Sequence, residues 1–306
     1  MPTAAEYLRP ELLAQVDRLD LRARFIIEGF YAGLHASPYR GFSVEFSEHR
    51  RYTPGDDPRT IDWNVYAKSD RFFVKQFRAE TNLEAYLLMD LSASMGFPAP
   101  EQIEPGGPPR MSKLDYAVCL AAALGYMMVR QQDSAGLALL GTGVRQFLPP
   151  RSTRAHLMRL LSELAAARPA GSTALADSLH DVARRVRKRG LMILFSDLLC
   201  DAEPVIEALH RLRFGGHDVI VFCVLDRAEA EFPYVGPTRF EDPEGGDPLS
   251  ADAASVRGAY LDALHALHQR YRDAAAAARC DFVAVNNTMS FDAALVRFLL
   301  DRQARF

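Results

Sequence analysis

The sequence predicts an α/β fold built on a doubly wound, mostly parallel sheet with one antiparallel edge strand. From about residue 84 onward, short apolar runs alternate with longer amphipathic segments, which is the order of strands and helices in such a sheet. The apolar runs are nearly continuous, as expected for strands buried on both faces. Two stretches rich in Pro and Gly, 98–110 and 232–250, are interpreted as surface loops or insertions.

The N-terminal part has a different character. Apolar residues at helical spacing predict a helix over about residues 10–35. Residues 40–80 are dense in aromatic residues and in charges of both signs, and short strands are expected at 42–46 and 72–77 around a strong turn signal. We therefore expect residues 1–80 to form a helix and a charged, partly β segment packed on a core domain of residues 81–306.

Within residues 81–306 the patterns give an ordered series of elements. Strands are expected at 85–90, 135–140, 191–196, 218–225 and 281–286, with a short antiparallel edge piece at 144–148. Helices are expected at about 112–131, 152–167, 174–189, 202–213, 252–279 and 291–303. Gly190 follows the basic end of one of these helices, and we expect it to cap that helix.

Composition excludes several classes of protein. The 306 residues are 49% hydrophobic and 25% charged, as in ordinary soluble globular proteins. A net charge of −3 argues against a general binder of nucleic acid or anionic membranes. No signal peptide is visible, and no apolar stretch approaches the roughly 18 residues of a membrane helix. The four cysteines are far apart, so we expect reduced, buried thiols and a cytoplasmic location.

Hydroxyl and carboxylate side chains follow the strands of the predicted sheet. Asp90-Leu91-Ser92-Ala93-Ser94 comes directly after the first apolar strand; taken alone, it fits a helix N-cap better than a metal site. Thr173 lies in a loop at the same sheet edge, and Asp197 follows another strongly apolar strand. Together these hard oxygen donors favour Mg²⁺, with Mn²⁺ or Ca²⁺ as alternatives, over Zn²⁺.

At this point the motifs resemble those of a known family. Asp-x-Ser-x-Ser at 90–94, the Gly-x-Thr loop at 171–173 and Asp197 look like the metal-ion-dependent adhesion site (MIDAS) of von Willebrand factor A domains. The 49–63 segment, His49-Arg-Arg-Tyr-Thr-Pro-Gly-Asp-Asp-Pro-Arg-Thr-Ile-Asp-Trp63, is similar to the signature of a bacterial A-domain-like family, catalogued as domain of unknown function fifty-eight. Members of that family often accompany MoxR-type AAA+ ATPases.

The resemblance implies roles for individual residues. Ser92 and Ser94 would bind the ion directly, while Thr173, Asp90 and Asp197 would act directly or through water. One coordination position would stay open for an Asp or Glu of a partner protein. The resemblance thus implies a non-enzymatic interaction module, working with a MoxR-type ATPase or a client protein in assembly, maturation or activation of a complex. The 98–110 insertion, just after the motif, would shield the site or select the partner.

Other functions remain open at this stage. A phosphoesterase or other hydrolase would use the same ion as a Lewis acid, although the sequence contains no P-loop and no Gly-x-Ser-x-Gly motif. An A domain without metal is a further alternative. His265 and His268 have metal-ligand spacing but lack an evident third ligand. The basic run 184–189 favours a solvated helix end over a nucleic-acid site.

The role of the 49–63 segment is also open. Its charged residues are expected to form ion pairs that fix the segment on the A domain, and a surface for a partner is the alternative. Trp63, the only tryptophan in the chain, is expected to have a packing role.

Overall fold

The computed structural model describes residues 44–51, 65–66, 71–79, 84–98, 111–289 and 291. The expected helices over 10–35 and 291–303, the turn within the 49–63 segment and nearly all of the 98–110 insertion lie outside these residues. The described residues fall into two compact units, one containing β1 and β2 and the other containing everything from Glu84 onward. None of the described helices is both long enough and apolar enough to cross a membrane.

The first unit contains an antiparallel pair of strands. β1 (Val44–Arg51) pairs with β2 (Phe73–Ala79), and the register runs from Val44 opposite Ala79 to Arg51 opposite Phe73. A register shift between Phe46 and Glu48 marks an irregularity in β1. Strands were expected here, but β1 begins later and extends further, so that it includes the start of the 49–63 segment.

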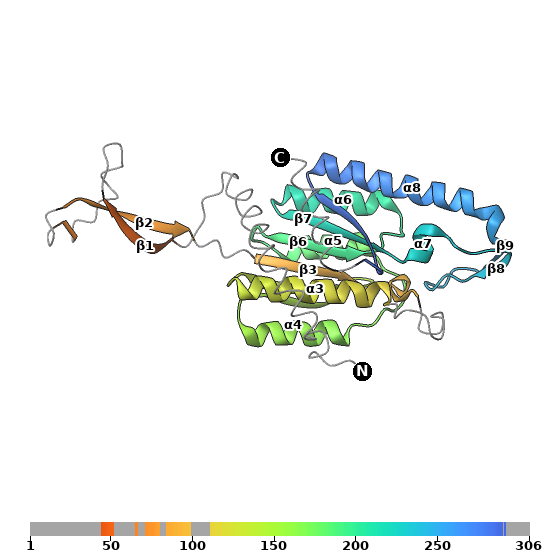
Figure 1. Cartoon of the computed structure of the whole chain (residues 1–306), viewed down its shortest axis with the longest axis horizontal. Coiled ribbons are helices and arrows are strands. Elements are labelled where there is room, and N and C mark those ends of the chain that lie inside the picture. Colours follow the sequence, from red (N-terminus) through yellow and green to blue (C-terminus); the bar gives the residue numbers. More distant parts are fainter. Residues whose placement is uncertain are drawn as a thin grey trace. The chain divides into compact units, whose positions relative to one another are not determined.

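The second unit is built on a six-stranded sheet with the order β10-β7-β6-β3-β4-β5 (Figure 1). All neighbouring strands are parallel except β4 and β5. This confirms the predicted mostly parallel sheet with one antiparallel edge strand. The strands are β3 (Glu84–Asp90), β4 (Ser134–Leu140), β5 (Val144–Arg151), β6 (Leu191–Ser196), β7 (Asp218–Leu225) and β10 (Asp281–Asn286).

Helices cover both faces of this sheet. Leu87 of β3 and Leu160 of α4 both lie against Gly125 of α3, so α3 and α4 cover one face. The core on the other face joins Leu88 of β3 to residues of α5, α6 and α8, and Figure 1 shows the same division. The helices are α3 (Lys113–Arg130), α4 (Arg154–Ala166), α5 (Leu175–Arg185), α6 (Ala202–Phe214), α7 (Arg227–Glu231) and α8 (Ala253–Ala278), with the short 3₁₀ helix η3 (Ala93–Gly96).

The strand order reverses beside β3. The chain passes from β3 to β4 on one side and later places β6 on the other side of β3. In sheets of this kind, ligands bind outside the carboxyl ends of the strands at such a reversal. Asp90 ends β3 and Asp197 directly follows β6, so the topology brings both carboxylates to this point.

The structure corrects the predicted role of Gly190. Helix α5 ends at Arg185, because Val186 adopts an extended conformation and is buried. Gly190 therefore does not cap the helix. It lies instead against the backbone of β3, where an added Cβ would come within 2.4 Å of the Glu84 carbonyl oxygen.

The 232–250 stretch also differs from a simple surface loop. It contains most of a short hairpin in which β8 (Pro237–Phe240) pairs antiparallel with β9 (Leu249–Asp252). These strands are only four residues long, which is too short for an alternating pattern to identify from the sequence.

We predict that Gly190→Ala lowers the free energy of unfolding by about 1–3 kcal/mol, because a methyl group cannot fit against the backbone there without displacing it. Urea denaturation measures this change. Gly258→Ala is the matched control: Gly258 lies in α8 with nothing within 4 Å of an added Cβ, and this change should stabilise the protein by up to about 1 kcal/mol. Equal stability of Gly190→Ala and wild type would contradict the close approach.

Candidate functional site

The carboxylate of Asp90 lies at the centre of the candidate site. Its Oδ1 accepts hydrogen bonds from the backbone N–H of Ser92 and from Oγ1 of Thr173, both at 2.9 Å. Its Oδ2 accepts a hydrogen bond of 2.6 Å from Oγ of Ser196. Asp90 is only 2% exposed, and these donors compensate the loss of water that burial imposes.

The two serines of the motif lie in the loop that leads into η3. Ser92 occupies the N-cap position of this short helix, but its side chain makes no capping hydrogen bond. Instead, the hydroxyls of Ser92 and Ser94 lie 3.0 Å apart. The Ala93 N–H donates to the carbonyl oxygen of Gly171, so this loop is joined directly to the loop that carries Thr173. The N-cap interpretation is therefore wrong for Ser92.

Asp197 follows β6 and has both carboxylate oxygens engaged. Oδ1 accepts a hydrogen bond from the backbone N–H of Leu199 at 3.2 Å. Oδ2 pairs with the ammonium of Lys113 at 2.7 Å. Lys113 is fully buried, so this ion pair holds Asp197 in a fixed position.

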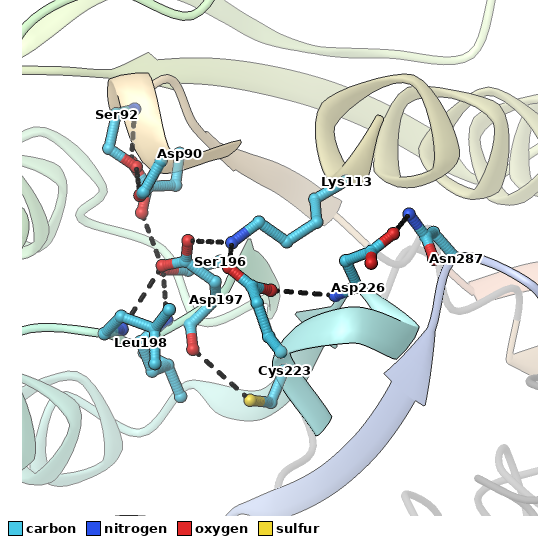
Figure 2. A network of polar contacts seen from close by, with 12 residues as sticks. Asp90, Ser92, Lys113, Ser196, Asp197, Leu198, Cys223, Asp226 and Asn287 are labelled. Carbon is cyan, nitrogen blue, oxygen red and sulfur yellow. Dashed lines mark hydrogen bonds and ion pairs between the residues drawn. The ribbon is translucent and has the colours of Figure 1, made fainter. Parts of the chain in front are cut away.

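Lys113 connects the candidate site to the segments that follow β7 and β10 (Figure 2). Its Nζ also pairs with Oε1 of Glu229 at 2.6 Å, and Oε2 of Glu229 accepts from the N–H of Asp226 at 2.8 Å. Asp226 caps α7, and its Oδ2 accepts from Nδ2 of Asn287 at 2.6 Å. A continuous polar network thus connects the ends of β6, β7 and β10 to the start of α3.

The local charge at the site is negative. Burial, followed by the negative charge of Asp197, raises the pKa of Asp90, while its hydrogen-bond donors act in the opposite direction. Burial alone would lower the pKa of Lys113, but Asp197 and Glu229 raise it above its usual value. Burial raises the pKa of Glu229, although Lys113 opposes this effect. The single ammonium of Lys113 therefore faces the two carboxylates of Asp197 and Glu229. The charges of these three groups sum to a negative value, and Asp90 lies close by.

The structure gathers all of the residues that the sequence singled out for a metal site. They lie at one edge of the sheet and are joined by the contacts described above: Asp90, Ser92, Ser94, Thr173 and Asp197. Sequence reasoning missed Ser196, Lys113 and Glu229. Ser196 was detectable as the single polar residue of an apolar strand beside Asp197, whereas neither charged residue follows a recognisable motif.

Other candidate residues have structural roles. His268 is buried against Cys223, with 3.6 Å between Nε2 and Sγ, and within the described ranges no three His, Cys, Asp or Glu side chains form a metal cluster. The arginines and lysine of the 184–189 run are exposed. The cysteines are free, as expected, but Cys200 is exposed rather than buried, because it lies in the loop between β6 and α6.

The strand order, the antiparallel edge strand and the three loops at the strand reversal define a von Willebrand factor A-like domain. BatB from Bacteroides thetaiotaomicron is similar over 73% of this chain and 100% of that chain, with 17% identity and a TM-score of 0.44. An aerotolerance-related membrane protein from Bacteroides fragilis is similar over 71% of this chain and 98% of that chain, with 17% identity and a TM-score of 0.46. These TM-scores are low, so the fold class rests on the topology of the sheet.

The chain belongs to the family described as protein of unknown function DUF58, which matches residues 48–270. Uncharacterised proteins of Mycobacterium bovis and Mycobacterium tuberculosis are 31% identical to it over 277 residues, which is 89% of this chain and 80% of each relative. The family predicted from the 49–63 segment is thus confirmed.

We predict that Lys113→Met lowers the free energy of unfolding by about 3–5 kcal/mol, because it leaves Asp197 and Glu229 buried without a counter-charge. Urea denaturation again provides the measurement. The control is Lys188→Met: Lys188 pairs with Glu84 at the surface and is 81% exposed, so its loss should cost less than about 1 kcal/mol. If both variants lose the same small amount, the buried ion pairs do not have the assigned role.

Proposed function

We propose that this domain is a protein-interaction module that holds a divalent cation, Mg²⁺ in the first place, at the carboxyl ends of β3 and β6. The observation that carries the proposal is the hydrogen bond from the Thr173 hydroxyl to Asp90. A hydroxyl that donates its proton to a carboxylate keeps its oxygen lone pairs free for a cation. The paired hydroxyls of Ser92 and Ser94, 3.0 Å apart, add two more neutral oxygens of the hard type that Mg²⁺ prefers.

The residues present fit such an ion. Ser92, Ser94 and Thr173 would hold it through their hydroxyl oxygens. Asp90 and Asp197 already have both carboxylate oxygens occupied by internal partners, which supports a role for them behind the hydroxyls, through water. The ion would supply a positive centre that attracts an additional carboxylate.

The charges around the site support a protein carboxylate as the additional ligand. Lys113 compensates part of the charge of Asp197, so the ion would not be neutralised by the protein itself and would retain affinity for an Asp or Glu of a partner. This partner would be a client protein or a MoxR-type AAA+ ATPase in the cytoplasm, in the assembly, maturation or activation of a complex. The ATPase is carried by the family resemblance alone, and the cytoplasmic location by the widely spaced cysteines.

A metal-dependent phosphoesterase remains the alternative function, and no specific observation favours it. The proposal expects no covalent chemistry at this site.

We predict that Mg²⁺ stabilises the protein, because an ion that binds only the folded state adds RT ln(1 + [Mg²⁺]/Kd) to the free energy of unfolding. This amounts to about 2.7 kcal/mol when free Mg²⁺ is about 100-fold above Kd. Thermal denaturation with increasing Mg²⁺ measures it. The Asp90→Ala/Ser92→Ala variant should show no such rise, and a rise of equal size in that variant would place the ion elsewhere.

We also predict that Asp90→Ala/Ser92→Ala abolishes Mg²⁺-dependent capture of partner proteins from lysate of the source cell, while EDTA abolishes capture by the wild type. The control, Asp273→Ala/Ser162→Ala, removes the same two types of side chain from exposed helix surfaces and should leave capture intact. Capture that is insensitive to EDTA would contradict the proposal. Phosphatase turnover by wild type that is lost in the Asp90/Ser92 variant would instead establish the alternative.

A further inference from the structure

Positive charge is concentrated at the edge of the second unit's sheet that lies opposite the candidate site. The parallel strands β3, β4, β6, β7 and β10 all begin at this edge, which we call the amino edge. Helices α5, α6 and α8 end there, because each of them leads into one of these strands or into the turn before it. Exposed cationic side chains lie where these helices end: the cations of the 184–189 run, Arg211 and Arg279.

The acidic residues at the amino edge are less exposed than the cations. Glu84 and Asp218 are half-buried, and each pairs with a cation of the same edge. Asp133 is buried, and Asp281 is half-buried. The surface that water reaches at the starts of these strands is therefore dominated by positive charge.

The 184–189 run lies beside the turn that follows α6. β6 and β7 pair with Leu191 opposite Asp218, and the Asp218 N–H donates to the carbonyl oxygen of Gly190 at 3.0 Å. The side chain of Arg189 lies against Gly216, where an added Cβ would come within 2.6 Å of the Arg189 Nε. The basic run and the turn over residues 214–217 thus form one continuous surface.

Arg213 holds this turn in place. Its Nη1 donates to the carbonyl oxygen of His217 at 2.8 Å and pairs with Oδ1 of Asp218 at 2.6 Å. Its Nε donates to the carbonyl oxygen of Ala278, the last residue of α8, at 3.3 Å. These contacts join the end of α6 to the end of α8, so Arg279 lies on the same surface.

Phe214 stands on this surface with its side chain in water. It is the last residue of α6 and is 97% exposed, whereas Leu212 just before it is fully buried. Among the described residues of the second unit, no other aromatic side chain is exposed. Because Arg213 fixes the turn, Phe214 is presented at a defined place among the cations, and its ring would gain free energy by leaving water.

The net charge of −3 does not describe this local surface. It argues against a general binder of anionic surfaces, but charges further apart than about 8 Å are largely screened at physiological salt. The negative charge of Asp197 and Glu229 lies at the opposite ends of the strands. An anionic ligand at the amino edge therefore meets the cations there and is little affected by the chain's total charge.

The combination of cations with one exposed ring fits a membrane surface better than a nucleic acid. Single-stranded nucleic acids are bound by several aromatic side chains on which successive bases stack, and the amino edge offers Phe214 alone among its described residues. An anionic bilayer needs cations that lie over its headgroups and an apolar side chain that enters the interface. Both are present at the amino edge.

We propose that the amino edge binds the surface of an anionic phospholipid membrane. The cations of the 184–189 run, Arg211 and Arg279 contact the headgroup phosphates, and Phe214 inserts between the headgroups. The attachment is peripheral and reversible, and the candidate site, at the opposite edge, faces away from the bilayer toward a partner. This inference does not depend on the metal site.

The test measures binding of the full chain to vesicles of phosphatidylglycerol and phosphatidylcholine by sedimentation, with EDTA present so that a bound divalent ion plays no part. Arg187→Gln/Lys188→Gln should weaken binding about 25-fold, since each cation near an anionic membrane contributes a factor of about five. Phe214→Ala should weaken it about fivefold or more, because it removes the side chain that enters the interface. Binding by the wild type should fall as salt is raised.

Matched controls make the same changes away from the amino edge. Arg227→Gln/Arg239→Gln removes two exposed cations from α7 and β8, which follow the carboxyl end of β7. Leu249→Ala shortens an apolar side chain of β9 that is 61% exposed. Both controls should bind the vesicles as the wild type does. All of the substituted side chains are exposed, so each variant should fold, and thermal denaturation checks this.

The other outcomes overturn the inference. A wild type that does not bind these vesicles, or binds vesicles of phosphatidylcholine alone equally well, excludes recognition of an anionic membrane. Equal losses in Arg187→Gln/Lys188→Gln and in its control would show that the amino edge is not the binding surface. Unchanged binding by Phe214→Ala would exclude insertion. Binding of a single-stranded oligonucleotide in place of vesicles, lost in the same variants, would assign the surface to nucleic acid.

Discussion

The buried carboxylate of Asp90 is the constraint on which the site depends. It accepts hydrogen bonds from the loop after β3, from the loop before α5 and from the last residue of β6. These segments are far apart in the sequence and meet only because the strand order reverses beside β3. A buried carboxylate needs all of these donors, so the requirement to satisfy Asp90 also fixes the hydroxyls that surround it.

Lys113 provides the second constraint. Its ammonium lies between Asp197 and Glu229 in a fully buried position, so part of the charge of Asp197 is compensated before any ion arrives. Two consequences follow for the proposed site. The first is that Asp197 has a buried counter-charge within the chain itself, because Lys113 pairs with it. The second is that a bound cation would rely on neutral hydroxyls and would remain attractive to an incoming carboxylate.

The sequence was sufficient to predict the sheet and which side chains meet at the candidate site, for physical reasons that particular residues illustrate. Strands buried on both faces appear in the sequence as apolar runs. Asp90 and Asp197 each stand at the end of such a run, which places both at the carboxyl edge of the sheet. The remaining contacts depend on tertiary packing. Lysine is a residue type that is usually exposed, and the burial of Lys113 at the start of α3 depends on its ion pairs with Asp197 and Glu229.

The most direct test of the account is a crystal structure of the protein grown with Mn²⁺, in which anomalous scattering locates the ion. The account predicts a peak at the reversal beside β3, coordinated by the hydroxyls of Ser92 and Ser94, with Thr173, Asp90 and Asp197 around it. If these residues are well ordered in crystals grown with excess Mn²⁺ and no anomalous peak lies among them, the account is contradicted. In that case Lys113 would be the cation that completes the domain.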